Sequence, residues 1–277
     1  MRDLKGQGVT GKQRLSILTL MSLNKDTNQL LGLAISAATQ ASHEILNVYH
    51  SGDFQAEAKG DNSPLTIADK NAHRAIVGIL QQSNIPILSE EGKAIPYDTR
   101  KNWEYFWMVD PLDGTKEFIK RNDEFTVNIA LIHRNKPILG VVAVPVSGDV
   151  YYATSGNGAY LKRNGMATRL ATRPPVDLSK KGLRVVASRS HMNPETQEFV
   201  DGLKEATLVS AGSSLKFLLL AEGKADVYPR YAPTMEWDTA AAHAIVLETG
   251  LQVLEYGSER PLLYNKESLL NPYFLVR

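Results

Sequence analysis

The sequence predicts an α/β (α+β) protein, in which an N-terminal antiparallel sheet with helices precedes a C-terminal α/β layer. Three observations predict this class. Two early segments keep apolar residues at helical spacing, residues 125–161 form short apolar runs separated by turn residues, and strands then alternate with helices. At 277 residues with 43% hydrophobic content, the chain can bury a large core.

Two helices are predicted before the sheet. The first runs from Asn28 to Gly52, and the second begins near Thr66, after the polar turn GDNSPLTIAD. A short strand over 85–88 then leads into Ser89-Glu90-Glu91-Gly92. The next strand, over 105–109, leads directly into DPLDGTKEF. Both strands therefore end in acidic residues.

The middle of the chain predicts antiparallel hairpins, because its apolar runs are joined by very short connections. These runs are FTVNIALIH, PILGVVAVPV, DVYYAT and GAYLKR. A polar, proline-bearing segment over 168–182 is typical of a linker. We therefore divide the chain into a leader (1–27), an N-terminal α+β half (28–167) and a C-terminal α/β half (168–277).

The C-terminal half predicts alternating strands and helices. The strands are LRVVAS, TLVSAG, ADVYPR and, as the last of them, LQVLEY. One helix begins at Asn193-Pro194, a capping residue followed by a first-turn proline. A second is capped by Ser213 or Ser214, and a third contains WDTAAAHAIVLE and ends at Gly250.

Composition excludes several classes of function. The formal net charge of +1 provides no general attraction to nucleic acid or to an anionic membrane. The absence of cysteine excludes disulfides, thiol catalysis and zinc–thiolate sites. No stretch reaches the roughly 20 apolar residues that a transmembrane segment needs. The apolar run over 15–23 resembles a signal peptide only loosely, because no small-residue cleavage site follows. We expect a disordered leader, or translation from Met21, rather than export.

The motif DPLDGT places Asp110 and Asp113 three residues apart at the end of a strand. Two carboxylates held close together repel each other unless a cation neutralises them, and hard oxygen ligands favour Mg²⁺, Mn²⁺ or Ca²⁺. Gly114 lets the backbone approach a ligand closely, and N–H groups where a helix begins suit a phosphate. A turn merely capped by aspartates is the alternative for this motif alone.

Three further acidic residues lie at the ends of other predicted elements, as Asp110 and Asp113 do. Glu90 follows a strand, while Asp69 and Asp238 lie near helix N-termini. Each alone is more often a helix cap or a solvated charge. Together with the DPLDGT aspartates they favour a phosphoryl-transfer site with several metal ions.

Other phosphate-binding and metal-binding patterns are absent from the sequence. No G-x-x-x-x-G-K-[ST] loop and no H-E-x-x-H pair occurs. The polar run from Ser188 to His191 follows a strand, where ligands often bind, so these two residues are candidates for substrate contact. An ordinary surface loop is the alternative.

In order along the chain, GDNSPLTIAD, LSEEG, WMVDPLDGTKEF and EWDTAAAHA resemble the motifs of the lithium-sensitive phosphatases of the inositol monophosphatase superfamily. The stretches GSSLKF and YPR look most like the bacterial CysQ type, the 3′(2′),5′-bisphosphate nucleotidases. The likeness runs from about Gln29 to the C-terminus. It implies a layered αβαβα fold with metal ions between the two halves.

The resemblance also implies roles for residues of the site. Two or three Mg²⁺ ions would be bound by carboxylates and one backbone carbonyl, contributed by Glu90, Asp110, Leu112, Asp113 and Asp238. Asp69 and Thr115, with Glu90, would act on the attacking water, and the Gly114 and Thr115 amides would hold the phosphate. Lys216 and Arg230, with Ser213, are candidate nucleotide contacts, and ordinary surface charge is the alternative for Lys216 and Arg230. Met235-Glu236, before Trp237-Asp238, differ from the family pattern and are expected to alter the wall of the nucleotide pocket.

The implied activity is hydrolysis of 3′-phosphoadenosine 5′-phosphate to AMP and phosphate, in nucleotide recycling during sulfate assimilation. Inositol monophosphatase or fructose-1,6-bisphosphatase activity is the main alternative. A haloacid-dehalogenase-type phosphatase or a nucleotide-binding sensor is less favoured. The resemblance implies a cytoplasmic enzyme, with a peripheral place on the inner membrane left open. It implies a small-molecule substrate and no nucleic acid, and the oligomeric state is undetermined.

Overall fold

The computed structural model of the 277-residue chain describes residues 11–58, 64–187 and 192–277, with side chains described from residue 27 onward. Ser188 and His191, two of the predicted substrate contacts, lie outside these ranges. A helix long and apolar enough to cross a membrane is not found in the part of the chain that the structure describes.

The main sheet contains seven strands within the described residues, and they are neighbours in the order in which they occur in the chain. The strands are β3 (Ile87–Ser89), β4 (Tyr105–Asp113), β5 (Thr126–His133), β6 (Lys136–Val144), β7 (Asp149–Thr154), β8 (Gly158–Arg163) and β9 (Met166–Arg169). All neighbours are antiparallel except β3 and β4, which are parallel. The predicted hairpins are therefore confirmed.

Two long helices cover one face of this sheet, α1 (Gly11–Ser51) and α2 (Ile67–Leu80). Their buried apolar residues form one core cluster with alternate residues of the strands, such as Trp107, Val109 and Ile129. Helix α2 begins where the sequence predicts, because the Thr66 side chain accepts a hydrogen bond from Ala68 N at 3.2 Å. A 3₁₀ turn (Gln81–Ser83) and two short strands, β1 (Glu57–Ala58) and β2 (Pro64–Leu65), flank these helices.

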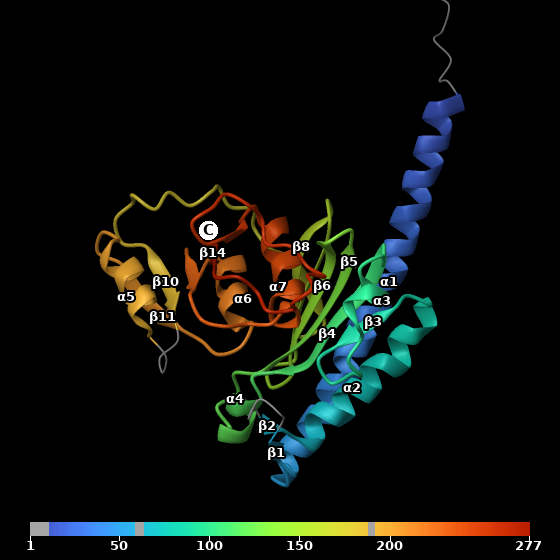
Figure 1. Cartoon of the computed structure of the whole chain (residues 1–277), viewed down its shortest axis with the longest axis horizontal. Helices are drawn as coiled ribbons and strands as arrows, with labels where there is room; N and C mark the ends of the chain where they lie inside the picture. Colours follow the sequence, from blue (N-terminus) through green and yellow to red (C-terminus); the bar gives the residue numbers. More distant parts are fainter. Residues whose placement is uncertain (1–10, 59–63, 188–191) are drawn as a thin grey trace, which may run out of the picture.

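The C-terminal half covers the other face with α6 (Leu215–Ala221) and α7 (Glu236–Glu248). Beyond these helices lie parallel strands β10 (Arg184–Ala187) and β11 (Thr207–Ser210), and an antiparallel set formed by β12 (Tyr228–Arg230), β13 (Val253–Glu255) and β14 (Phe274–Val276). A bridge between Val185 and Val227 joins the two sets. Helix α5 (Pro194–Asp201) lies at the outer edge, capped by Asn193 as predicted. Figure 1 shows the resulting sequence of layers, which is the predicted αβαβα order.

Helix α7 lies unusually close to the main sheet at Gly140 of β6. A Cβ atom at this position would be 2.1 Å from the Ala241 carbonyl oxygen and 2.8 Å from Ala244 Cβ. Small residues on both sides therefore set the approach of the helix. A second core cluster contains residues of the sheet, α6, α7 and the C-terminal strands, so this face of the sheet and the C-terminal half share an apolar interior. The close approach brings the first turn of α7 beside the ends of the sheet strands.

Several details differ from the sequence-based expectations. Helix α1 begins at Gly11 rather than near Asn28, since no glycine or proline interrupts residues 12–27; residues 1–10 lie outside the described residues. Strand β9 extends the sheet into the predicted linker, and β14, not LQVLEY, is the last strand. The hairpin between β8 and β9 turns at Asn164-Gly165, both with positive φ, which is a recognisable hairpin signal. The short helices α3 (Tyr97–Arg100) and α4 (Thr115–Lys120) complete the elements.

Candidate functional site

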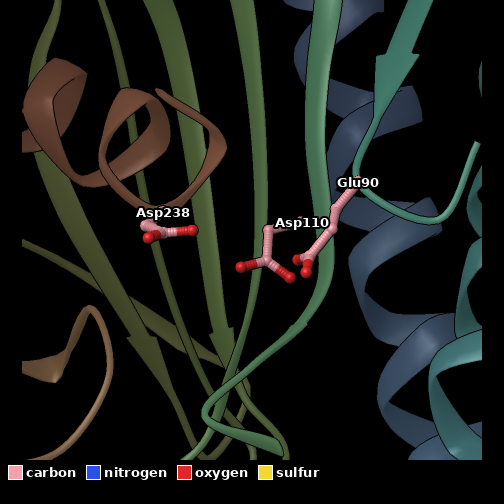
Figure 2. Close-up of side chains that lie close together, drawn as sticks. All are labelled: Glu90, Asp110 and Asp238. Carbon is pink, nitrogen blue, oxygen red and sulfur yellow. The ribbon is translucent and has the colours of Figure 1, made fainter. Parts of the chain in front are cut away.

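Three carboxylates from three separate elements converge at one end of the main sheet. Oxygen atoms of Glu90, Asp110 and Asp238 all lie within 4.8 Å of one another, and they are the one such group found in the described residues. Figure 2 shows the three side chains, with Glu90 from the chain after β3, Asp110 from β4 and Asp238 beneath helix α7. Only oxygen ligands are present, which suits Mg²⁺, Mn²⁺ or Ca²⁺ rather than a softer metal.

The parallel pairing of β3 with β4 brings the first two carboxylates together. Glu90 N donates to the Val109 carbonyl at 3.1 Å, so Glu90 lies beside the residue that precedes Asp110. The pairing of β4 with β5 then shifts between Asp110 and Asp113. Such an irregularity bends a strand and redirects its side chains. Leu112 N donates to Asp110 Oδ1 at 3.0 Å and stabilises this turn.

Asp238 occupies the third position of helix α7. Its Oδ2 accepts a hydrogen bond from Met235 N at 2.9 Å, so the carboxylate also caps the helix. The positive end of the helix dipole favours a carboxylate at this place. The sequence-based alternatives, a helix cap and a site residue, are therefore compatible for Asp238.

Asp113, a predicted metal ligand, lies next to this group but is not part of the mutual 4.8 Å set. Its Oδ2 accepts hydrogen bonds from Ser214 N at 2.6 Å and, more weakly, from Thr126 Oγ1 at 3.5 Å. Thr126 is itself buried and lies 2.7 Å from Ser214 Oγ. The sequence predicts no role in the site for either residue. It indicates Ser214 only as one of two candidate caps of α6, and it does not single out Thr126.

The described residues around the site provide too little positive charge to balance its carboxylates, as the raised pKa values of three of them indicate. Burial, followed by the charges of Glu90, Asp113 and Asp238, raises the pKa of Asp110 well above its ordinary value. Burial and the charge of Asp113 likewise raise the pKa of Asp238. Burial raises the pKa of Asp113 to about 6, although Lys216 and the Ser214 amide oppose this shift. A divalent cation would supply the missing charge, so the residues present fit a metal site.

Asp69 and Thr115 are joined as the predicted pair. Thr115 Oγ1 donates to Asp69 Oδ1 at 3.2 Å, with the Leu112 carbonyl at 3.3 Å as the alternative acceptor for the same proton. Asp69 Oδ2 accepts from Thr66 N at 2.7 Å and from Thr66 Oγ1 at 2.6 Å, which completes the capping box of α2. Asp69 is therefore held from the helix side while it orients the Thr115 hydroxyl.

Gly114 connects β4 to α4 in a left-handed conformation with φ of 94°. A Cβ atom here would lie 3.0 Å from the Glu124 carbonyl oxygen and 3.3 Å from Ser213 Cβ, so the conformation favours glycine and a side chain would be crowded. Its position brings the backbone of the DPLDGT turn against the Ser213 segment of the C-terminal half.

A cavity of about 210 Å³ opens beside the carboxylates, between the two halves. Asp113, Gly114 and Asp238 line it, as do three predicted nucleotide contacts, Ser213, Lys216 and Arg230. Glu117, Phe217, Tyr228 and Thr234 also line it and were not predicted.

Two cationic side chains, Lys216 and Arg230, line this cavity. Lys216 is buried, and its Nζ donates to the Ser213 carbonyl at 3.1 Å. Burial lowers the pKa of Lys216, while the neighbouring Asp113 charge acts in the opposite direction. Arg230 Nη2 donates to the Pro233 carbonyl at 2.9 Å, and its buried Nε has no hydrogen-bond partner among the described residues. Both groups lie in the wall of the cavity that Asp113 and Asp238 also line.

Met235 and Glu236, expected to alter the wall of the nucleotide pocket, do not line this cavity. The cavity wall at this place is formed by Thr234, Asp238 and Thr239. The Glu236 side chain is fully buried and forms an ion pair with Lys266 at 2.6 Å. The first turn of α7 faces the cavity with Asp238 and Thr239, whereas the Glu236 carboxylate binds the segment that begins at Asn265.

Comparison with known proteins gives consistent matches over almost the whole chain. A model of the inositol monophosphatase family matches residues 26–273. The 3′(2′),5′-bisphosphate nucleotidase CysQ of Escherichia coli (strain K12) is 44% identical over 254 residues, which cover 89% of this chain and 99% of the relative. The crystal structure of CysQ from Bacteroides thetaiotaomicron superposes with a TM-score of 0.79 at 48% identity, covering 89% of this chain and 96% of that one. A Thermotoga maritima IMPase (TM-score 0.70, 23% identity, 89% and 91% covered) shares the fold.

Proposed function

The chain belongs to the inositol monophosphatase family, and we propose that it is a metal-dependent phosphatase that hydrolyses 3′-phosphoadenosine 5′-phosphate to AMP and phosphate. The observation that carries this proposal is the 44% identity to a bisphosphate nucleotidase over 99% of that relative's length. The carboxylate group beside a cavity with two cationic side chains supports it. Inositol phosphates and fructose 1,6-bisphosphate are the competing substrates.

Glu90, Asp110 and Asp238 would bind a first metal ion. Asp113 and the Leu112 carbonyl would contribute ligands to a second metal ion. The convergence of three oxygen ligands within 4.8 Å supports the first assignment. The raised pKa of Asp113, to about 6, supports the second, since a nearby cation would lower it again. We propose Mg²⁺, which when bound would supply Lewis acidity for the phosphoryl oxygens and for the attacking water. Inhibition by Li⁺ follows from the family resemblance.

Asp69 and Thr115 would orient the attacking water. Because the Thr115 hydroxyl donates a hydrogen bond to Asp69, its oxygen lone pairs are available to accept a hydrogen bond from the water. Glu90 would share in holding this water. The water oxygen would form the new bond to phosphorus in line with the breaking bond to the 3′-oxygen. The proton that the water loses would pass by way of Thr115 to Asp69, and the leaving 3′-oxygen would take a proton from a solvent water and depart as a hydroxyl.

The substrate would be held across both halves of the molecule. The Gly114 and Thr115 amides lie where a helix begins and suit the reacting phosphate. Lys216 and Arg230 carry the positive charge that the other phosphate requires, and Ser213 lines the same wall. The predicted contacts Ser188 and His191 stay proposals, because they lie outside the described residues.

A substrate panel tests this proposal. Purified protein with Mg²⁺ is offered 3′-phosphoadenosine 5′-phosphate, inositol 1-phosphate and fructose 1,6-bisphosphate, and released phosphate is measured with and without excess chelator. We expect a kcat/KM for the nucleotide at least about tenfold above the others, and no turnover in chelator. Preference for inositol 1-phosphate or fructose 1,6-bisphosphate would overturn the proposed substrate. Full activity in chelator would overturn the proposed metal dependence. A trapped phosphoaspartate would indicate haloacid-dehalogenase chemistry, and intact nucleotide after long incubation would indicate a sensor.

Cytoplasmic location, with or without peripheral attachment to the inner membrane, belongs to the same proposal. Cell fractionation with antibody detection distinguishes these places. We expect the protein in the fraction that contains no membranes.

A further inference from the structure

The proposed metal site depends on two elements that are far apart in the chain. Glu90 follows β3 in the N-terminal half, whereas Asp238 belongs to the first turn of α7 in the C-terminal half. Their carboxylate oxygens lie within 4.8 Å, so a small displacement of α7 would change the site. The contacts that hold this end of α7 therefore bear on metal binding.

Glu236 is the charged residue that anchors the first turn of α7. Its carboxylate is fully buried and accepts hydrogen bonds from Asn265 N at 2.6 Å, from Lys266 N at 3.0 Å and from Lys266 Nζ at 2.6 Å. Asn265 has a positive φ of 65°, and successive N–H groups in such a conformation can form an anion-binding concavity. Residues 265 and 266 thus form a built receptor for this single carboxylate.

Arg100 holds the same segment from the opposite side. Its Nη1 donates to Asn265 Oδ1 at 2.8 Å and to the Lys266 carbonyl at 2.6 Å, while Nη2 donates to the Glu267 carbonyl at 2.8 Å. The Asn265 amide donates back to the Arg100 carbonyl at 2.8 Å. Arg100 is the last residue of α3, the first helix after Glu90 in the chain. The segment 265–267 is therefore fixed between the element after Glu90 and the turn that carries Asp238.

We propose that Arg100, the segment 265–267 and Glu236 form a bracket that sets the separation between Glu90 and Asp238, which makes Glu236 and Arg100 positioning residues for the metal site. Glu236 does not line the cavity, so its effect passes through the backbone of the first turn of α7, where Asp238 follows two residues later. A buried ion pair contributes little net stability relative to an apolar pair of the same shape, whereas it demands one particular geometry. The bracket rests on the metal role proposed above.

The test compares two isosteric variants on the same helix. In Glu236→Gln one acceptor oxygen becomes an amide group, which disturbs the receptor at residues 265 and 266. In the control Glu248→Gln the same change is made at the other end of α7, where the carboxylate accepts from Gly156 N at 2.8 Å and Gly158 N at 2.7 Å. Mg²⁺ binding is measured by isothermal titration calorimetry without substrate, beside the melting temperature.

We expect Mg²⁺ to bind about tenfold more weakly to Glu236→Gln than to wild type, which is the low end of the effect found for residues that support metal ligands. The Mg²⁺ affinity of Glu248→Gln should stay within about twofold of wild type. Excess Mg²⁺ should restore kcat in Glu236→Gln, with the KM for the nucleotide nearly unchanged. Arg100→Lys, which disturbs the bracket from its other end, should weaken Mg²⁺ binding similarly, and it carries the test if Glu236→Gln does not fold.

Wild-type affinity in the bracket variants would overturn the proposal, as would an equal loss in Glu248→Gln, because that pattern reports general destabilisation. In both cases wild-type protein still binds Mg²⁺, and the proposed function stands. If wild-type protein binds no Mg²⁺, the proposed metal role fails and the bracket loses its purpose with it.

Discussion

Two carboxylate clusters in this molecule differ in whether they carry their own positive charge. Asp226 accepts hydrogen bonds from Arg173 Nη2 at 2.7 Å and from three nitrogen atoms of Arg184 at 2.7–2.9 Å. Hydrogen bonding from Arg184 is the largest cause that lowers the pKa of Asp226 to about 2. In the candidate site, by contrast, burial and neighbouring carboxylates raise the pKa of Asp110 and Asp238.

The difference separates a structural cluster from a ligand-binding one. Asp226 joins Arg184 of β10 to Arg173 of the segment after β9, and its charge is compensated within the chain. The candidate site holds carboxylates from both halves without comparable compensation, so cations from solution would stabilise its charged form. Acidic residues identified in the sequence can therefore be sorted by the cations that surround them in space.

The largest effect should follow removal of one charge from the candidate site by Asp110→Asn. The amide keeps the shape, and its oxygen can still accept from Leu112 N. We expect phosphate release with saturating Mg²⁺ to fall by on the order of 10²-fold or more, since a charge that binds the cation is lost. The metal-free protein should melt at a higher temperature than wild type, because repulsion within the cluster falls. Near-wild-type turnover would contradict the site assignment.

Metal-free wild-type protein should lose stability as the pH rises through the site's titration. The folded-state pKa of Asp113 is about 6 against an ordinary 3.8, so between about pH 4 and pH 6 the folded protein binds more protons than the unfolded chain. The free energy of unfolding should therefore fall across this window, by on the order of 2 kcal/mol. Urea unfolding in chelator at several pH values measures this. Saturating Mg²⁺ should remove the decrease, and a chelated protein that gains stability over this range would contradict it.

Asp226→Asn is the matched change in the structural cluster. It should lower the free energy of unfolding by about 1–2 kcal/mol, less than for a fully buried pair because Arg184 is partly exposed. Since the pKa of Asp226 is depressed to about 2, this contribution is complete above about pH 4 and lost as the pH falls toward 2. Urea unfolding of both proteins should therefore converge in acid, while Mg²⁺ binding and turnover at neutral pH stay unchanged. A large fall in turnover would show that the two clusters are not independent.

The smallest effect is expected from starting the chain at Met21. Neither cluster includes a residue before Asp69, so deletion of residues 1–20 should leave Mg²⁺ affinity and the Asp226 contribution unchanged. We expect turnover within about twofold of the full chain, measured by phosphate release. A marked loss would show that the beginning of α1 supports the site, and that residues 1–27 are not a separate leader.

Local signals in the sequence predicted much of the fold. The hairpins of the main sheet follow from apolar runs joined by tight turns. The start of α2 near Thr66 and the Asn193 cap of α5 follow from local sequence, and both helix starts are stabilised by side chains that bond to amides within three residues. The family resemblance predicted the layer order and the convergence of Glu90, Asp110 and Asp238. The predictions of hairpins and helix starts succeed because periodicity, capping and turn formation depend on neighbours in the chain.

What the sequence by itself determined is therefore the set of elements, the acidic residues at their ends and the family to which they belong. The tertiary structure alone decided that Asp113 accepts from Ser214, that Glu236 faces Asn265 rather than the cavity, and that Arg184 neutralises Asp226. The two residues in each of these contacts lie far apart in the chain, by 29 positions in the smallest case and by 101 in the largest. Their geometry depends on how closely α7 and the C-terminal strands pack against the main sheet. Packing of this kind sums over many side chains, and no short stretch of sequence contains it.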